Sequence, residues 1–307
     1  MAFQVSPGVL VQERDLTRII PAVSTAIGAF AGSFNKGPLD EIVSISSEQE
    51  LVDTFGKPDS TNFEYFFSAA NFLQYSNSLR VVRATQTNAV NASTSGTGVL
   101  IKNTDDWTNN YASGGQAGNA TFVAREAGTD GNNLQVSTCP NAAAYEQEGA
   151  TTVNDASTAV GDTVVVAASG AALNVGDIIS FSTTAATNDY DDGEQYRVTN
   201  ISTNDVTIVQ HPRGTGGLKR ALTDGSNIRR RWKYYDAVDG APGTSTYVSE
   251  RNGANDEIHV VVIDEDGGIS GVPGTILETF SKLSKASDAK DPQGNDNYYP
   301  NVIYTKS

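Results

Sequence analysis

The fold of the first domain follows from the stretch Ala69-Ala70-Asn71-Phe72-Leu73-Gln74-Tyr75-Ser76-Asn77-Ser78-Leu79-Arg80-Val81-Val82-Arg83-Ala84. Its first half continues an aromatic helical pattern to about Tyr75, and residues 79–84 then alternate as in a strand. Leu79, Val81 and Arg83 fall on one side of that strand, and Arg80 falls on the other. The stretch holds no catalytic residue, so it favours an assembly role over an enzymatic one.

A small α+β domain is predicted over residues 21–86. Residues 22–34 are small and β-compatible, and Gly28 and Gly32 predict a strand that another element approaches closely. A helix should start at Ser46 or Ser47, because Ser47 and Glu50 have the spacing of a capping box, and Gly56 should end it.

A second helix is predicted from about Thr61, with Glu64 as the capping partner of Thr61, to about Tyr75. Its apolar residues cover more than one helical face. We therefore expect this helix to be buried on two sides.

An arm is predicted over residues 1–20. Pro7 and Gly8 mark a turn, and residues 9–13 alternate like a short strand that has too few apolar residues for a core of its own. We expect the arm to pair with something else. Residues 87–119, rich in Thr, Asn, Ser and Gly, are predicted to be a linker.

A core domain interrupted by an insertion is predicted for the rest of the chain. Residues 120–141 and 249–307 should form an α/β core, with strands at 134–138 and 257–263 and an amphipathic helix from Thr275 to Leu283. Residues 142–248 should form an all-β, barrel-like inserted domain, with strands at 163–167, 177–181, 195–201 and 206–209. The two chain crossings, where the chain leaves the core for the inserted domain and where it returns, should lie close together. The fold class is therefore α+β multidomain.

Composition excludes several functional classes. The 307 residues carry a net charge of −15, which argues against broad nucleic-acid binding because phosphate contacts need a basic surface. One cysteine, Cys139, excludes an intrachain disulfide. No apolar run is long enough to cross a bilayer, and we expect no signal peptide. The charge is better explained by solubility and self-repulsion, so assembly would require geometrically specific contacts.

Chemical motifs are weak, and no catalytic, metal or cofactor residue is predicted. The two histidines, His211 and His259, lack a metal-binding spacing, and His259 is more simply a satisfied histidine on a strand. Gly32 and Gly37 are spaced as in a phosphate loop, but the lysine and hydroxyl that should follow Gly37 are missing.

Two acidic groups could bind calcium weakly, although solvated turns explain them better. They are Asp189, Asp191, Asp192 and Glu194, and Asp264, Glu265 and Asp266. The basic run Arg229-Arg230-Arg231 next to Trp232 could hold a nucleic-acid strand, but in so acidic a chain a structural patch facing acidic neighbours is favoured.

Four regions of the chain resemble the tail sheath proteins of contractile-tailed bacteriophages, particularly the T-even-like and cyanophage group. They are Ser6-Pro7-Gly8-Val9 with Glu13; Gly37-Pro38 followed by Glu50-Leu51-Val52-Asp53-Thr54-Phe55-Gly56-Lys57-Pro58; Phe72-Leu73-Gln74-Tyr75 to Leu79-Arg80-Val81-Val82-Arg83-Ala84; and Leu277 to Asp291 with Asn297-Tyr298-Tyr299. Residues 142–248 do not carry the resemblance.

This resemblance implies a non-enzymatic virion protein without cofactors, assembled in the host cytoplasm. It would polymerise as a helical homo-oligomer around the inner tail tube protein, between baseplate and tail terminator, and would contract to deliver the genome without binding nucleic acid or inserting into a membrane. Sheath proteins usually continue beyond a segment like Asn297 to Ile303, so we expect a longer protein in preference to completion by a second polypeptide.

The resemblance also directs attention to subunit contacts. A sheath needs a repeating heterologous contact that does not close. Residues 4–14 suit this task as a strand added to a neighbour's sheet edge. The predicted interface residues are Val5, Val9, Val11, Glu13, Arg80 and Arg83. The alternatives are a sheath subunit of a non-phage contractile injection system and, less favoured, a glycan-active β protein using Asp191 and Glu194.

Overall fold

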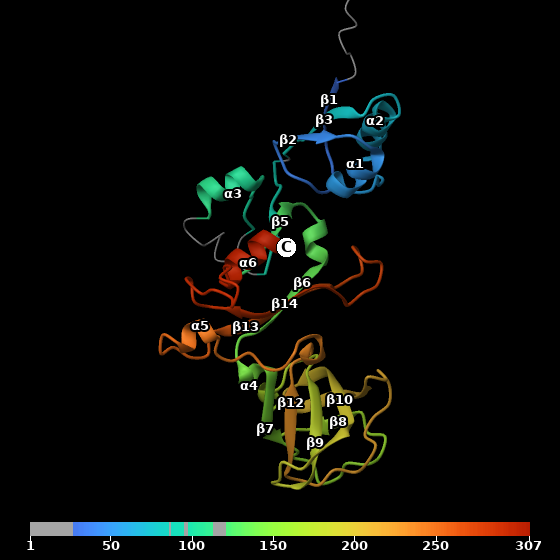
Figure 1. Ribbon diagram of the computed structural model, residues 1–307. Coiled ribbons are helices and arrows are strands. Elements are labelled where there is room, and N and C mark those ends of the chain that lie inside the picture. Colours follow the sequence, from blue (N-terminus) through green and yellow to red (C-terminus); the bar gives the residue numbers. More distant parts are fainter. Residues whose placement is uncertain (1–26, 86, 95–97, 113–120) are drawn as a thin grey trace, which may run out of the picture. The chain divides into compact units, whose positions relative to one another are not determined.

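The computed structural model describes residues 27–85, 87–94, 98–112 and 121–307, so the predicted arm at residues 1–20 lies outside the described residues. These residues form a mixed α+β protein, and their strands make four sheets (Figure 1). The chain divides into two compact units, Met1–Asn132 and Asn133–Ser307.

The first unit contains a three-stranded sheet of order β1-β3-β2 and a two-stranded sheet of β4 and β5. Strand β1 runs parallel to β3, and β2 runs antiparallel to it. The elements are β1 (Ile27–Gly32), β2 (Ile42–Ile45), α1 (Glu48–Phe55), α2 (Phe63–Leu73), β3 (Ser78–Arg83), β4 (Asn91–Ser93), α3 (Thr104–Asn110), β5 (Val123–Ala127) and the 3-10 helix η1 (Asp130–Asn133).

Local capping explains where the two helices of the first domain begin. The Ser47 side chain accepts a hydrogen bond from the Glu50 backbone N–H, which confirms the predicted start of α1. The Glu50 carboxylate reaches back one residue further than in a capping box and accepts from the backbone N–H of Ser46 at 2.8 Å. The predicted box at Thr61 and Glu64 is wrong, because Thr61 donates to Asp59 and α2 begins after Asn62.

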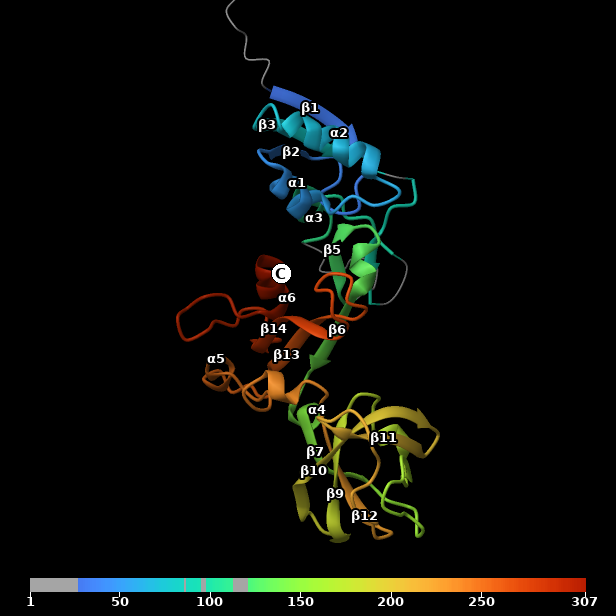
Figure 2. The same cartoon turned by 90° about the vertical axis from the view of Figure 1, so that its right-hand side faces the viewer.

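Both helices pack on one face of the three-stranded sheet. Figure 2 shows α2 running alongside β1, and the ring of Phe72 lies against Gly28, where a Cβ atom would come within 2.6 Å of it. The predicted close approach at Gly28 is therefore confirmed. The core between the helices and the sheet contains Phe34, Ile45, Leu51, Phe55, Phe66, Ala69, Ala70, Leu79 and Val81.

The second unit contains a six-stranded antiparallel sheet and a three-stranded antiparallel sheet of order β14-β13-β6. Its elements are β6 (Leu134–Cys139), α4 (Ala142–Tyr145), β7 (Glu146–Thr152), β8 (Val164–Val166), η2 (Gly170–Ala172), β9 (Ile178–Ala185), β10 (Tyr190–Ser202), β11 (Asp205–His211), β12 (Ser226–Arg231), η3 (Tyr235–Ala237), α5 (Thr246–Ser249), β13 (Glu257–Asp264), β14 (Thr275–Ser284) and α6 (Tyr299–Lys306).

The six-stranded sheet has the order β7-β12-β9-β10-β11-β8 and surrounds its own apolar core, which includes Tyr196, Ile208 and Ile228. It does not close into a barrel. Its two end strands are joined just past their ends by an isolated bridge between Val153 and Ala167. The strands predicted from alternation in this part of the chain are all present, with shifted ends.

The helix predicted from Thr275 to Leu283 is wrong, because these residues form strand β14. Residues 275–284 pair with β13 along its whole length, so backbone hydrogen bonds to a distant segment decide the conformation. Two register shifts interrupt the pairing and blur the period-2 alternation that would have marked a strand. The core sheet is consequently antiparallel.

The two chain crossings between these sheets lie side by side, as predicted. Glu146 and Arg231 are register partners, and Trp232 donates its backbone N–H to the Tyr145 carbonyl at 2.8 Å. The Trp232 ring stacks on His259 with ring centroids 6.4 Å apart, and its indole N–H donates to Ser137. An aromatic junction therefore joins the six-stranded sheet to the core sheet.

His259 is fully buried in this junction and satisfied on both ring nitrogens. Its Nε2 lies 3.0 Å from the Gly240 carbonyl, and its Nδ1 accepts from the backbone N–H of Lys282. This pattern requires the neutral imidazole with the proton on Nε2. Burial lowers the pKa of His259 below its usual value of 6.5.

We predict that this histidine makes the second unit sensitive to mild acid. Below about pH 6.5 the unfolded chain binds a proton that the folded chain excludes, so the free energy of unfolding falls by up to about 1.4 kcal/mol per pH unit until the lower, folded pKa is reached. Urea unfolding at pH 7.5 and 5.5 should show this loss, and the variant His259→Gln should show less of it. An NMR titration in which His259 is already half protonated at pH 6.5 would contradict the prediction.

Candidate assembly surface

Of the six predicted interface residues, the structure describes Arg80 and Arg83, whereas Val5, Val9, Val11 and Glu13 lie outside the described residues. Both arginines belong to β3, the central strand of the first sheet. Their side chains point to opposite faces, because neighbouring residues of a strand alternate. Arg80 is exposed, and Arg83 is only 6% exposed.

The Arg83 guanidinium binds three backbone carbonyls of the loop that follows β1. Its Nε donates to the Phe34 oxygen at 2.8 Å, its Nη1 to the Gly37 oxygen at 2.7 Å and its Nη2 to the Asn35 oxygen at 3.0 Å. Burial lowers the pKa of Arg83, although the nearby carboxylates of Glu126 and Asp130 favour its charged form. The loop is thereby fixed to the end of β3.

A backbone N–H group of the same loop donates a hydrogen bond to a carboxylate. Gly37 donates its backbone N–H to the Glu126 side chain at 2.7 Å, across 89 residues of sequence. A phosphate loop would point several N–H groups at an anion. Here the loop carbonyls surround a cation and the Gly37 N–H already has a carboxylate partner. Sequence analysis did not identify Glu126, because nothing in the local pattern around β5 marks its partner.

Two edges of the first sheet are open to further strands. Within the part of the chain that the structure describes, β1 and β2 each pair along their length with β3 alone. Such an edge presents unpaired backbone N–H and C=O groups that another strand can pair with. Arg80 has no ion-pair partner among the described residues, and it stands between Ala29 of β1 and Ser44 of β2 in the register.

The basic run at Arg229 to Arg231 is neutralised by acids of its own chain. Arg229 contacts Asp192 and lies 3.6 Å from Glu146, and Arg231 lies 3.1 Å from Glu146. Arg230 pairs with the buried Asp177 at 3.1 Å and also donates to carbonyls of α4. These ion pairs fit the structural interpretation of the run as a patch that meets acidic neighbours.

The acidic groups are also occupied in local contacts. Asp189 accepts from Thr183, Asp191 accepts from the Gly193 N–H, and Glu194 pairs with Arg220 at 2.9 Å. Asp264 accepts from the Ser270 backbone and hydroxyl, which holds the turn after β13. Across the described ranges, no three His, Cys, Asp or Glu side chains are grouped in a way that could hold a metal ion.

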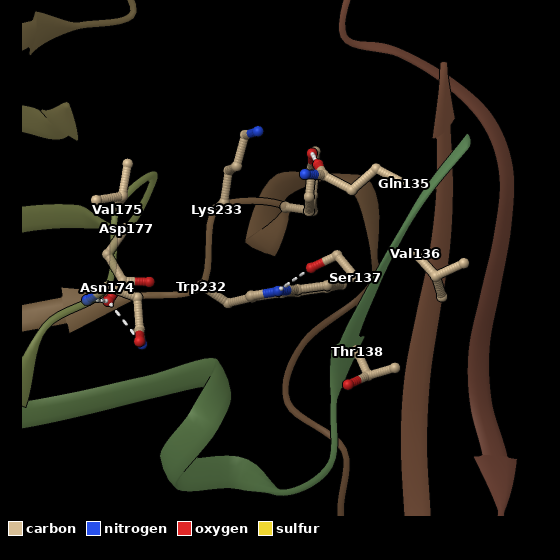
Figure 3. Close-up of a pocket in the computed structure, with 10 residues that line it drawn as sticks. Gln135, Val136, Ser137, Thr138, Asn174, Val175, Asp177, Trp232 and Lys233 are labelled. Carbon is tan, nitrogen blue, oxygen red and sulfur yellow. Dashed lines mark hydrogen bonds between the residues drawn. The ribbon is translucent and has the colours of Figure 1, made fainter. Parts of the chain in front are cut away.

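One cavity of about 300 Å³ lies between β6 and the residues around Asp177 (Figure 3). Figure 3 shows the Trp232 indole donating to Ser137 across it. Its single lining carboxylate, Asp177, is paired with Arg230, and burial raises the pKa of Asp177. The lining residues include no nucleophile paired with a base.

No helix in the described segments has the length and apolar character needed to cross a bilayer.

Replacing Arg83 should destabilise the first unit strongly. Arg83→Met leaves three loop carbonyls without their donors, and we expect a loss of about 3 to 5 kcal/mol in the free energy of unfolding. Arg83→Lys should recover little of this free energy, because an ammonium group cannot donate to the three carbonyls in the geometry of a planar guanidinium. Arg80→Met on the same strand is the control and should change stability by less than about 0.5 kcal/mol. Equal effects of the two Met variants in urea unfolding would refute the role of Arg83.

The ion pairs also predict that the chain does not bind nucleic acid measurably. Fluorescence anisotropy with a single-stranded oligonucleotide should detect no binding at moderate salt, because each arginine of the run already faces a carboxylate. The double variant Glu146→Gln and Asp192→Asn frees Arg229 and Arg231 and should gain salt-dependent affinity. If the unaltered chain binds the oligonucleotide in a salt-dependent way, and this binding disappears in Arg229→Gln, the prediction that the arginines are neutralised is contradicted.

Comparison with known proteins gives a consistent result. Residues 25–84 match the family model described as tail sheath protein Gp18 domain III N-terminal region. The chain is 35% identical over 131 residues to the tail sheath protein of Enterobacteria phage T4, covering 43% of this chain and 20% of that protein. It is 40% identical over 78 residues to the tail sheath protein of Vibrio phage KVP40, covering 25% of this chain and 12% of that protein.

The aligned parts thus span a fifth or less of the length of these relatives. The family match coincides with the domain built from β1, α1, α2 and β3, the same segment that Arg83 organises. The matched segments of the chain are therefore similar to parts of phage tail sheath proteins.

Proposed function

We propose that the chain is a structural subunit of a contractile tail sheath, which polymerises as a helical tube around an inner tail tube and contracts to drive that tube through the host envelope. The observation that carries this proposal is the sheath-family match of residues 25–84. The two open edges of the same sheet support it, because they offer sites for strand addition between subunits.

In this proposal the partners are further copies of the chain, the inner tail tube protein, and the proteins that end the tail at the baseplate and the terminator. The subunit acts without catalysis, and its energy source is the difference between two packings of the lattice. Strand linkages between subunits persist while contacts between subunit bodies are exchanged. Nucleic acid is no partner of the sheath subunit, in keeping with the neutralised arginines of β12.

The N-terminal arm is proposed as the linking strand. Residues 4–14, with Val5, Val9, Val11 and Glu13, would add to an open sheet edge of a neighbouring subunit. Arg80 is proposed as an interface residue because it is exposed and lacks an ion-pair partner among the described residues. Arg83 would contribute to the interface by holding the loop beside the sheet in place.

The proposal predicts tubes, and it predicts that the arm is needed for them. Electron microscopy of the purified chain should show helical tubes, whereas a chain without residues 1–15 should stay folded, with an unchanged circular dichroism spectrum, and should form no tubes. The arm deletion leaves the described core intact, so the loss would reflect linkage and not folding. Normal tubes from the deleted chain would exclude the arm as the linking strand.

A further inference from the structure

Helix α2 has a second apolar side that the described residues leave uncovered. Phe66, Ala69 and Ala70 are buried against the sheet. Phe63 and Phe67, one helical turn apart, are 48% and 50% exposed. The expected burial of this helix on two sides is therefore met on one side only. Aromatic side chains held on a regular helix are typical anchors of protein interfaces.

The three-stranded sheet also has a face that no described residue covers. Helices α1 and α2 pack on the face that carries Leu79 and Val81, and the opposite face is exposed within the described part of the chain. On it Ile27 is 59% exposed and Ile42 is 63% exposed. The register places Ala31, Val82 and Ile42 in one row across the sheet and Ala29, Arg80 and Ser44 in the next. A mostly small and apolar sheet face normally packs against another layer.

These two surfaces complement each other in shape and charge. The helix side offers bulky rings, and the sheet face offers alanines with aliphatic residues at its margins. Glu64 is the only charged residue of α2, and Arg80 is the only charged residue that the three strands carry on the open face. Neither side chain has an ion-pair partner among the described residues.

We infer that the exposed side of α2, with Phe63, Glu64 and Phe67, docks on the open sheet face of a second copy of this chain, with Glu64 facing Arg80 of that copy. The inference rests on the proposed function and deepens it by naming a body-to-body contact between subunits. The two surfaces belong to opposite layers of one domain. Each copy can therefore bind one neighbour with its helix and another with its sheet.

A second copy is favoured as the occupant for two reasons. A contact between unlike surfaces does not close, so it builds the open-ended polymer that a sheath requires, whereas a helix-to-helix contact would close as a dimer. A helix-to-helix contact would also bring two Glu64 carboxylates together in a chain of net charge −15. The contact between helix and sheet instead pairs Glu64 with Arg80.

The test uses two variants of the full chain, each altered on one surface. The helix variant is Phe63→Ser with Phe67→Ser, and the sheet variant is Ala31→Lys with Ile42→Lys. All four residues are exposed, so urea unfolding should confirm that both variants keep the wild-type fold. The control, Val160→Ser with Val175→Ser, removes two exposed apolar side chains from the second unit.

Sedimentation velocity at about 0.1 mM should show open-ended association for the unaltered chain and for the control. Each variant alone should associate at least about thirty-fold more weakly. An equimolar mixture of the two variants, each also lacking residues 1–15 so that the arm cannot link subunits, should form 1:1 dimers and nothing larger, because only one intact pair of surfaces remains. A sheet variant that still dimerises alone would overturn the inference, as would an unaltered chain that stays monomeric.

Charge reversal gives an independent measurement. Glu64→Lys and Arg80→Glu should each weaken association, and the chain that carries both changes should recover it. Failure of the double variant to recover would contradict the pairing of Glu64 with Arg80.

The outcomes separate this inference from the proposed function. Tubes that form normally from both surface variants would overturn the inference and leave the sheath proposal standing. The predicted 1:1 dimers from a chain that never forms tubes would support the contact and contradict the sheath proposal.

Discussion

A single buried cation organises the part of the chain that matches the sheath family. The Arg83 guanidinium binds the carbonyls of Phe34, Asn35 and Gly37, and Glu126 binds the N–H of Gly37 from the other side. A buried charge is tolerated only when its donors are satisfied, so the loop must hold the conformation that satisfies them. This constraint fixes the connection between β1 and the rest of the domain. Among the described residues, β1 and β2 pair with β3 alone, and Ile27 and Ile42 on one sheet face are exposed.

In the second unit a largely buried arginine also binds backbone carbonyls, and there it helps to join two sheets. Arg230 joins the buried Asp177 to the carbonyls of α4, and the Trp232 ring stacks on His259 next to it. The six-stranded sheet is thus fastened to the core sheet by an ion pair and an aromatic stack at adjacent chain crossings.

Sequence reasoning succeeded where a local residue pattern marks the structure. It predicted the cap at Ser47 from the spacing to Glu50, and it predicted a close approach at Gly28 from the missing side chain, although the approaching ring, Phe72, belongs to a distant segment. It failed at residues 275–283, where pairing with β13 outweighs local pattern, and at Thr61, where Asp59 competes for the hydroxyl. The partners of Arg83 and of Arg229 to Arg231 could not be predicted, because they lie 37 to 87 residues away and several are backbone carbonyls that no side-chain pattern marks.

The central claim is that residues 27–84 form a rigid assembly domain whose two layers contact different neighbours. A helical reconstruction of the assembled tubes by electron cryomicroscopy tests it most directly. The claim predicts that α2 of each subunit lies on the open face of the β1-β3-β2 sheet of the next subunit, with Arg83 still enclosed by its own loop. A reconstruction in which that sheet face and the Phe67 ring both face solvent, in every contraction state, would contradict it.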